Sequence, residues 1–218
     1  FYNYLLIKSV KKNKCYIIAE AGLNHNGSVE MAKKLIDIAA ESKVDAVKFQ
    51  KRTISELAIK KELDKEDNRF PSFGITYGEI RAFLEFDYNE YTLLKKYAEN
   101  YNLDFIVTPF DLEAVNFLES IDLEIYKLAS HSLTNLDLLN RVANLNKPTI
   151  LSTGMSEIED IDIAVDIFKT HKNNKLSLLH CVSAYPTPLS ECNLSMINYY
   201  KKRYNLKVGY SGHEIGFL

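Results

Sequence analysis

Residues 104–130 read DFIVTPFDLEAVNFLESIDLEIYKLAS, and this stretch decides the fold. The apolar run at 104–109 is rich in β-branched residues and is typical of a buried strand. The amphipathic segment at 112–121 predicts a helix, for which Asp111 is a suitable N-cap. A second strand-like run begins at residue 124. This order predicts two parallel strands joined by a helix that covers the sheet.

The same unit recurs along the chain. Strand-like runs occur at 15–22, 45–51, 104–109, 124–130, 148–154, 176–186 and 206–213. Helices are expected at 28–43, near 88–101, and at 112–121, 135–145 and 157–171, with Ser28 and Ser156 as further N-caps. The interval between the second strand and residue 88 is expected to hold a long loop of the kind that often carries function.

Seven such units predict an α/β fold, the (β/α)8 TIM barrel, which takes about 250 residues. An open sheet of seven parallel strands would leave two exposed edges, so we expect residues 1–218 to form an incomplete barrel domain, truncated after the seventh strand. A doubly wound open sheet is the alternative architecture. It is disfavoured because no GxGxxG follows the first strand, and because polar residues end every strand rather than line one crevice.

Composition excludes several classes of protein. Of 218 residues, 46% are hydrophobic, and 27 Lys and Arg against 29 Asp and Glu give a net charge of −2. This balance argues against a general nucleic-acid or anionic-membrane binder. The apolar runs are far shorter than the ~20 residues that cross a bilayer. Three cysteines without a CxxC pair, and no signal-peptide pattern in residues 1–14, favour a cytoplasmic location.

Polar side chains gather at the predicted C-terminal ends of the strands, where barrels build their active sites. These are Glu20, Lys48, Gln50, Thr108, Lys127, Ser130, Ser152, Thr153, His180, Ser183, Tyr185, Ser211 and His213. Residues two apart share one face of a strand, so several of these side chains form same-side pairs. Because all seven predicted strands end in polar or charged side chains, we expect a functional site there rather than strand ends that are merely solvated.

Two lysines are the most informative of these residues. Lys48 and Lys127 each lie within an apolar run, where an unpaired buried ammonium would cost several kcal/mol. Two cations in one site indicate an anionic ligand, and nearby hydroxyl groups are neutral donors that could complete a phosphate or carboxylate cage. These hydroxyls belong to Thr108, Ser130, Ser152 and Ser211. A Schiff base on Lys127 is the alternative role.

The five histidines have different predicted roles. His131 and His171 are expected in surface or loop positions, and His180 in core packing. His25, in the NHNG turn, could cap that turn or contact substrate. His213, in the loop after the seventh strand, is the best metal-ligand candidate. One histidine is not a metal site, and Mn²⁺ or Zn²⁺ would need further ligands.

Six motifs appear in order between residues 17 and 217: IIAEAGLNHNGS, VKFQKRT, YKLASHSLTN, LSTGMSEIED, LLHCVSAYPTP and VGYSGHEIGF. Together they resemble the sialic acid synthase family, the phosphoenolpyruvate-dependent nonulosonate synthases. TYGEIRAFLEF at 76–86 is also similar to a segment of that family. The resemblance implies condensation of phosphoenolpyruvate with an N-acylmannosamine-type amino sugar, which gives a nonulosonic (sialic) acid and phosphate. It also implies a homodimer and a C-terminal antifreeze-like domain beyond residue 218.

The resemblance further implies roles for individual residues. Phosphoenolpyruvate would contact Lys48, Thr108, Lys127, Ser130, Ser152, Ser183 and Ser211. His213 would bind a divalent metal ion, typically Mn²⁺, and Glu20, Gln50 and Tyr185 would surround the sugar or the attacking water. Catalytic roles would fall to Glu20, Lys127 and His213. Ser183 stands where several family members carry Asn. The family's second metal-binding His and its sugar-contacting Arg are expected beyond residue 218.

Two other functions remain open from the sequence. One is a different phosphoenolpyruvate-dependent aldol-type sugar-acid synthase, which the NHNG and SAYPTP segments disfavour. The other is a non-catalytic barrel that binds a ligand or serves as a scaffold. Two buried cations argue against it, because a relaxed pocket would not need them.

Overall fold

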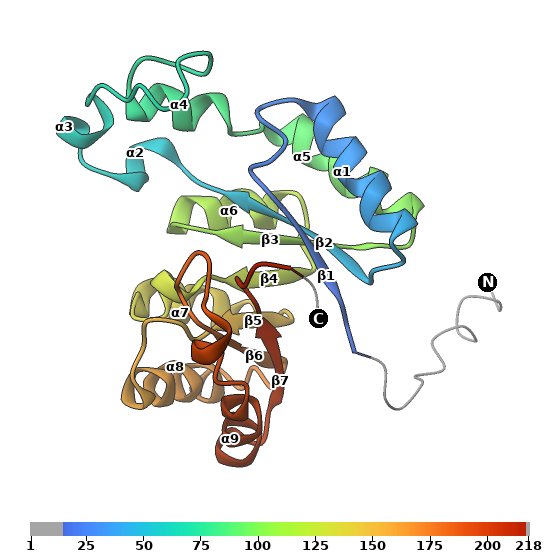
Figure 1. Cartoon of the computed structure of the whole chain (residues 1–218), viewed down its shortest axis with the longest axis vertical. Helices are drawn as coiled ribbons and strands as arrows, with labels where there is room; N and C mark the ends of the chain where they lie inside the picture. Colours follow the sequence, from blue (N-terminus) through green and yellow to red (C-terminus); the bar gives the residue numbers. More distant parts are fainter. Residues whose placement is uncertain (1–14, 217–218) are drawn as a thin grey trace.

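The computed structural model describes residues 15–216 and consists of strands and helices that alternate along the chain (Figure 1). The strands are β1 (Ile18–Gly22), β2 (Ala46–Lys51), β3 (Asp104–Pro109), β4 (Ile125–Leu128), β5 (Thr149–Ser152), β6 (Leu176–Cys181) and β7 (Lys207–Ser211). They form one sheet in the order β1 to β7, and every neighbouring pair is parallel. The predicted α/β barrel class is therefore confirmed, and the seven strands lie where the sequence places them. Within the described residues, β1 and β7 each pair with one neighbour, so this part of the barrel is open.

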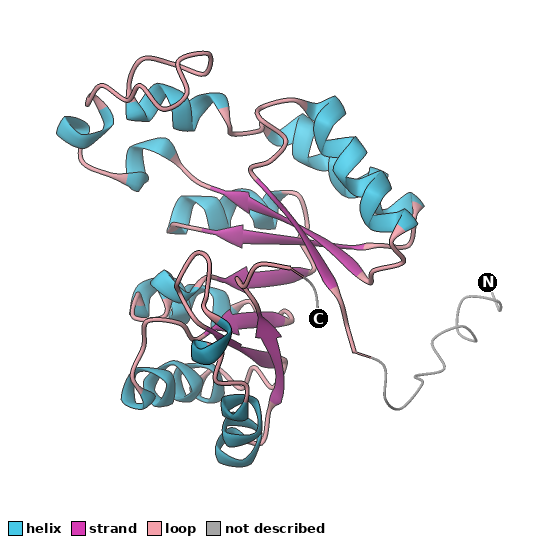
Figure 2. Ribbon diagram, in the orientation of Figure 1, coloured by secondary structure: helices cyan, strands magenta, loops and turns pink. Residues whose placement is uncertain are grey.

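Helices connect the strands and lie outside the sheet (Figure 2). The main connections are α1 (Val29–Glu41), α5 (Tyr88–Asn100), α6 (Leu112–Ser120), α7 (Leu136–Asn144), α8 (Ile158–Thr170) and α9 (Ser195–Tyr204). Short 3-10 turns, η1 (Ser130–Ser132) and η2 (Leu189–Glu191), follow β4 and β6. No helix within residues 15–216 is both long and apolar enough to cross a membrane. The segment in which we looked for a signal peptide lies outside the described residues.

The segment after β2 is not a plain loop, and that prediction was wrong. It holds three short helices, α2 (Ile54–Leu57), α3 (Lys60–Leu63) and α4 (Tyr77–Phe83), which lie beyond the end of β2 (Figure 1). An antiparallel bridge joins Glu66 to Thr76, and Thr76 caps α4 through the backbone N–H of Glu79. The helices α2 and α3 have four residues each and α4 has seven, so each makes only one or two turns and leaves little apolar periodicity in the sequence.

The predicted helix caps agree with the structure at two of three positions. Ser28 Oγ accepts from the backbone N–H of Met31 at 3.2 Å. Ser156 is not the cap of α8, because its hydroxyl donates back to the carbonyl of Gly154 at 3.2 Å. The N-cap is Glu157, whose backbone N–H donates to Asp160.

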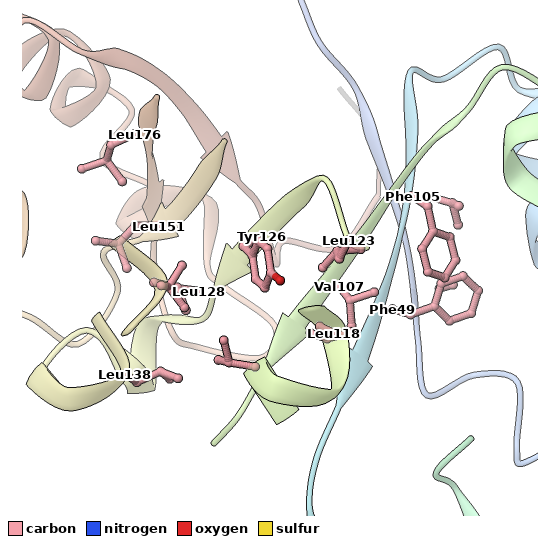
Figure 3. Packing of buried hydrophobic residues seen from close by; sticks show 14 of the residues in the cluster. Phe49, Phe105, Val107, Leu118, Leu123, Tyr126, Leu128, Leu138, Leu151 and Leu176 are labelled. Atoms are coloured by element: carbon pink, nitrogen blue, oxygen red, sulfur yellow. The ribbon is translucent and has the colours of Figure 1, made fainter. Parts of the chain in front are cut away.

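The hydrophobic core fills the space between the sheet and the outer helices, as Figure 3 shows for part of it. The strands contribute Val47, Phe49, Phe105, Val107, Tyr126, Leu128, Leu151, Leu176 and Leu178, and the helices contribute Ile36, Leu94, Leu118, Leu138, Val142, Ile161 and Phe168. Successive strand side chains point to opposite faces. Lys48 and Lys127 lie between core residues of β2 and β4, so their side chains belong to the inner face of the curved sheet.

Asp111 joins two elements, and its loss should destabilise the fold. One carboxylate oxygen accepts from the N–H of Ala114 in α6 at 2.6 Å, and the other from the N–H of Thr53 at 2.7 Å. Asp111→Ala is expected to lower the free energy of unfolding by about 1–3 kcal/mol, because a cap and a second hydrogen bond are lost. Urea unfolding measures this. Glu113→Ala in the same helix turn is the control, and an equal loss in both variants would contradict the assignment.

Candidate active site

The ends of β1, β2 and β3 bring four of the predicted site residues into one hydrogen-bonded group. Glu20 is the register partner of Lys48, and Gln50 is the partner of Thr108. Lys48 Nζ lies 2.6 Å from Glu20 Oε2 and donates to Thr108 Oγ1 at 3.2 Å. Gln50 Nε2 donates to Glu20 Oε1 at 2.9 Å. Lys48 is therefore already paired with a carboxylate.

Lys127 on β4 differs from Lys48. It is 8% exposed, and no carboxylate of the described residues lies within ion-pair distance. The pKa of its amine is lowered to about 7, mainly by burial and also by the nearby ammonium of Lys48, while Glu20 acts in the opposite direction. An anion that reached this amine would favour its charged form. Lys127 is thus the residue of this site with the clearest unmet need for a negative partner.

Hydroxyl groups also gather at the ends of β4, β5 and β6. Ser130 Oγ accepts from the backbone N–H of Gly154 at 3.0 Å. Space at Gly154 is so small that an added Cβ would collide with Ser183 Oγ and lie 3.0 Å from Ser130 Oγ. Ser152 is 1% exposed, and its Oγ has no hydrogen-bond partner among the described residues. A ligand oxygen could satisfy this buried hydroxyl, because buried polar groups are normally hydrogen-bonded.

The end of β7 lies next to the end of β6. Ser211 is the register partner of Cys181. His213 Nδ1 lies 2.9 Å from the carbonyl oxygen of Val182, and its ring centroid is 4.1 Å from that of Tyr185. Tyr185 is 74% exposed, so a ligand could contact its ring beside His213.

His213 fits one position of a metal site. Donation from Nδ1 to the Val182 carbonyl leaves the Nε2 lone pair free, as metal-binding histidines require. Residues 15–216 contain no group of three His, Cys, Asp or Glu side chains that could hold a metal ion by themselves. His213 therefore supplies at most one ligand, and the others would come from elsewhere.

The remaining histidines have structural positions. His25 is buried, its Nδ1 accepts from the N–H of Gly27, and burial lowers its pKa to about 4, so it caps its turn as a neutral side chain. His180 packs in the core, and its Nε2 bonds to the carbonyl of Cys192 at 2.8 Å. His131 lies in η1 and His171 caps α8, both in connecting segments as predicted.

Two further residues around the site were missed from the sequence. Arg52 is buried, its Nη2 donates to Gln50 Oε1 at 2.6 Å, and its guanidinium stacks on the ring of Phe110. The carboxylate of Glu85 accepts from the backbone N–H of Arg52 at 3.1 Å, and burial raises the pKa of this carboxyl. Arg52 continues the alternation of Lys48 and Gln50 by one step, and that signal could have identified it. No pattern in the sequence points to Glu85.

A model described as the NeuB family matches residues 35–218. The chain belongs to the NeuB family. This confirms the resemblance to sialic acid synthases that the six motifs carry. The chain spans little more than half of the length of the curated relatives that it matches.

Two of these relatives are named as synthases of nonulosonic acids. The NeuB chain is 40% identical over 209 residues to the N,N'-diacetyllegionaminic acid synthase of Campylobacter jejuni, covering 93% of this chain and 62% of that protein. It is 37% identical over 204 residues to the N-acetylneuraminate-9-phosphate synthase of Drosophila melanogaster, covering 93% of this chain and 55% of that protein.

Solved structures agree on the fold of this NeuB chain. The crystal structure of the N-acetylneuraminic acid synthetase of Leptospira borgpetersenii matches with a TM-score of 0.82 and 38% identity, over 94% of this chain and 67% of that one. A truncated 3-deoxy-D-arabino-heptulosonate 7-phosphate synthase of Thermotoga maritima matches with a TM-score of 0.62 but 15% identity. That second likeness extends to the fold alone.

Proposed function

We propose that the whole protein condenses phosphoenolpyruvate with an N-acylmannosamine-type amino sugar, giving a nonulosonic acid and phosphate. The observation that carries the proposal is Lys127, a buried amine near Lys48 that has no carboxylate partner among the described residues. The buried hydroxyl of Ser152, on the next strand, also lacks a hydrogen-bond partner there. Phosphoenolpyruvate has two anionic ends, which suit two cations and several neutral donors. The named activities of the relatives support the same reaction class.

The side chains of the site suit the steps of this reaction. Lys127, Lys48 and the hydroxyls of Ser130, Ser152, Ser183 and Ser211 would bind and orient phosphoenolpyruvate. Its C3 would attack the sugar aldehyde, and the new C–C bond would leave positive charge at C2. Water would then add at C2, and Glu20, whose carboxylate lies 2.6 Å from Lys48 Nζ, would accept its proton. Cleavage of the bond from C2 to the bridging oxygen would release phosphate and leave a keto group.

A divalent cation, Mn²⁺ in our proposal, would be held in part by Nε2 of His213. When bound, it would polarise the aldehyde oxygen and stabilise the alkoxide that forms there. The contact between His213 and Val182 supports this role, because it orients the ring with Nε2 free.

A Schiff base on Lys127 is the second candidate for the chemistry of this site. Its lowered pKa favours it, since a neutral amine is the nucleophile in such reactions. The two mechanisms separate on borohydride treatment in the presence of the keto acid product. Reduction would link the product to Lys127 in the Schiff-base mechanism and would leave the protein unmodified in the proposed one.

We also propose that the whole protein is a cytoplasmic homodimer with a C-terminal antifreeze-like domain. The motif resemblance supports the dimer and the added domain. The sparse cysteines support the location. Light scattering of the full-length protein tests the dimer, and a monomeric mass would contradict it.

Phosphate release from phosphoenolpyruvate tests the proposed reaction. The full-length protein would be assayed with Mn²⁺ or EDTA, against N-acylated mannosamines, their 6-phosphates and diacetylated amino sugars. We expect release that requires both the metal and one sugar. Phosphoenolpyruvate binding without release would point to an acceptor outside this set. The absence of both binding and release would favour a scaffold barrel instead.

Gly154→Ala should weaken the binding of phosphoenolpyruvate. The added methyl group would push Ser130 and Ser183 apart, although the backbone of Gly154 can accommodate alanine. Loss of one or two hydrogen bonds to a charged ligand predicts about 10–100-fold weaker binding. Isothermal titration calorimetry measures the dissociation constant. Wild-type affinity in this variant would remove the two serines from the anion site.

A further inference from the structure

We propose that Arg52 is a positioning residue that fixes the side-chain amide of Gln50 and, through it, the carboxylate of Glu20. This inference rests on the proposed function for its kinetic consequences. Arg52 Nη2 donates to Gln50 Oε1 at 2.6 Å, and Gln50 Nε2 donates to Glu20 Oε1 at 2.9 Å. The other oxygen of Glu20 lies 2.6 Å from Lys48 Nζ. A continuous chain of contacts thus links Arg52 to the reacting groups.

The guanidinium determines which way the Gln50 amide faces. An amide has one acceptor side and one donor side, whereas arginine only donates. If the amide of Gln50 rotated by half a turn, its NH2 group would face the donors of Arg52 and its oxygen would face the carboxylate of Glu20. Both contacts would be repulsive. A charged donor at position 52 therefore keeps Nε2 of Gln50 directed at Glu20.

The surroundings of Arg52 favour this contact over others. The side chain is 8% exposed, and its guanidinium carbon lies 3.6 Å from the ring centroid of Phe110. Nη1 is 3.9 Å from Glu85 Oε1, beyond hydrogen-bond distance, and it has no hydrogen-bond partner in the described residues. The other oxygen of Glu85 accepts from Lys51 Nζ and from the backbone N–H of Arg52, both at 3.1 Å.

A buried cation with one unsatisfied nitrogen adds little stability to a fold. The contact of Arg52 with Gln50 is short and charge-assisted, which makes it the strongest hydrogen bond of this guanidinium. Orientation of Gln50 is thus the clearest contribution of Arg52. Glu20 would lose one of its two anchors if Gln50 turned away, whereas Lys127 and the serines would stay in place.

Kinetics of the full-length protein test the chain of contacts with Arg52→Met, Gln50→Ala and the double variant. Misplacement of Glu20 should lower kcat by about 10–100-fold in Arg52→Met. The KM for phosphoenolpyruvate should change by less than about threefold, because its proposed ligands remain. If Arg52 acts through Gln50, the double variant should be no slower than Gln50→Ala alone. Arg52→Lys should recover part of kcat, because lysine also only donates.

A control variant separates this role from general effects of removing an arginine. Arg141→Met removes a guanidinium that pairs with Glu119 between the outer helices α7 and α6, and kcat should stay unchanged. The proposal would be overturned if the loss of kcat in the double variant equalled the product of the two single-variant losses. It would also be overturned if Arg52→Met kept the wild-type kcat. If Arg52→Met did not fold, the same cycle with Arg52→Lys would decide the question.

A second readout needs no turnover, so it tests Arg52 separately from the proposed reaction. Gln50 is the sole glutamine in these 218 residues. In protein labelled with ¹⁵N-glutamine, the side-chain amide signals of Gln50 are identified by their loss in Gln50→Ala. We expect Arg52→Met to shift these signals and to speed their exchange with solvent, and Arg141→Met to leave them unchanged. Unchanged Gln50 signals in Arg52→Met would overturn the positioning role, whether or not the full-length protein catalyses the proposed reaction.

Discussion

Lys127→Ala is expected to weaken the binding of phosphoenolpyruvate about 100-fold or more. Removal of one partner of a buried charge pair costs about 2–5 kcal/mol, and Lys127 would face its anion with little water between them. Calorimetric titration of the full-length protein with phosphoenolpyruvate measures the loss. An unchanged affinity would remove Lys127 from the anion site.

Two companion variants exclude a folding defect as the cause. Lys127→Met keeps most of the side-chain volume and removes the charge. Because burial disfavours that charge in the unliganded fold, Lys127→Met should be at least as stable as the wild type in urea unfolding at pH 6. Lys147→Ala, which removes an exposed ion pair with Asp122 and Glu124, should bind phosphoenolpyruvate normally.

The same lysine predicts a pH dependence of binding. The pKa of its amine is lowered to about 7, so it is charged below pH 7 and largely neutral above it in the empty site. An anion favours the charged form, so binding above pH 7 takes up a proton and the affinity falls as the pH rises. The ligand's own titration is common to the wild type and Lys127→Met. The wild type should therefore show a steeper fall above pH 7, and equal slopes would contradict the assignment.

His213→Ala is expected to abolish metal-dependent turnover and to weaken the binding of Mn²⁺ by at least about 100-fold. Loss of a residue that merely orients a ligand already costs 10–100-fold in metal affinity, and loss of the ligand itself should cost more. Calorimetry or electron paramagnetic resonance measures Mn²⁺ binding without any need for activity.

Controls for His213 use its own contacts. His213→Asn can still donate to the carbonyl of Val182 but lacks the imidazole nitrogen, so it should lose the metal as well. His171→Ala changes a helix end that bonds to Asn140 and should behave as wild type. Full activity of His213→Ala in the presence of EDTA would show that this histidine has no role in holding a metal.

Local patterns were enough to predict the fold, but not the contacts between strands. The seven strands and the helices α1, α5, α6, α7 and α8 follow from apolar runs and periodicity, which are properties of neighbouring residues. The helix α9 (Ser195–Tyr204) was not predicted. The pairing of Lys48 with Glu20 depends on the register of β1 against β2, and that register is set by tertiary packing. From the sequence alone, Lys48 could only be described as a buried cation.

For the candidate site, too, the sequence predicted which strand-end residues take part but not which contacts they make. Residues at strand ends were found because a barrel gathers such ends on one face. Arg52 and Glu85 were missed for different reasons. Arg52 lies just past the end of β2, and Glu85 reaches the site from the segment between α4 and α5, far from it in sequence. The alternation of Lys48 and Gln50 could have identified Arg52, whereas a side chain that arrives from a connecting segment, as Glu85 does, follows no strand alternation.

The fate of the bridging oxygen of phosphoenolpyruvate tests the proposed reaction most directly. The full-length protein would be incubated with Mn²⁺, its acceptor sugar and phosphoenolpyruvate labelled with ¹⁸O in the oxygen that joins C2 to phosphorus. The masses of both products would then be measured by mass spectrometry. We expect the label to leave with phosphate and the other product to be a nine-carbon 2-keto acid without label. Unlabelled phosphate, or pyruvate in place of the keto acid, would mean that the P–O bond breaks and that the site is not a synthase.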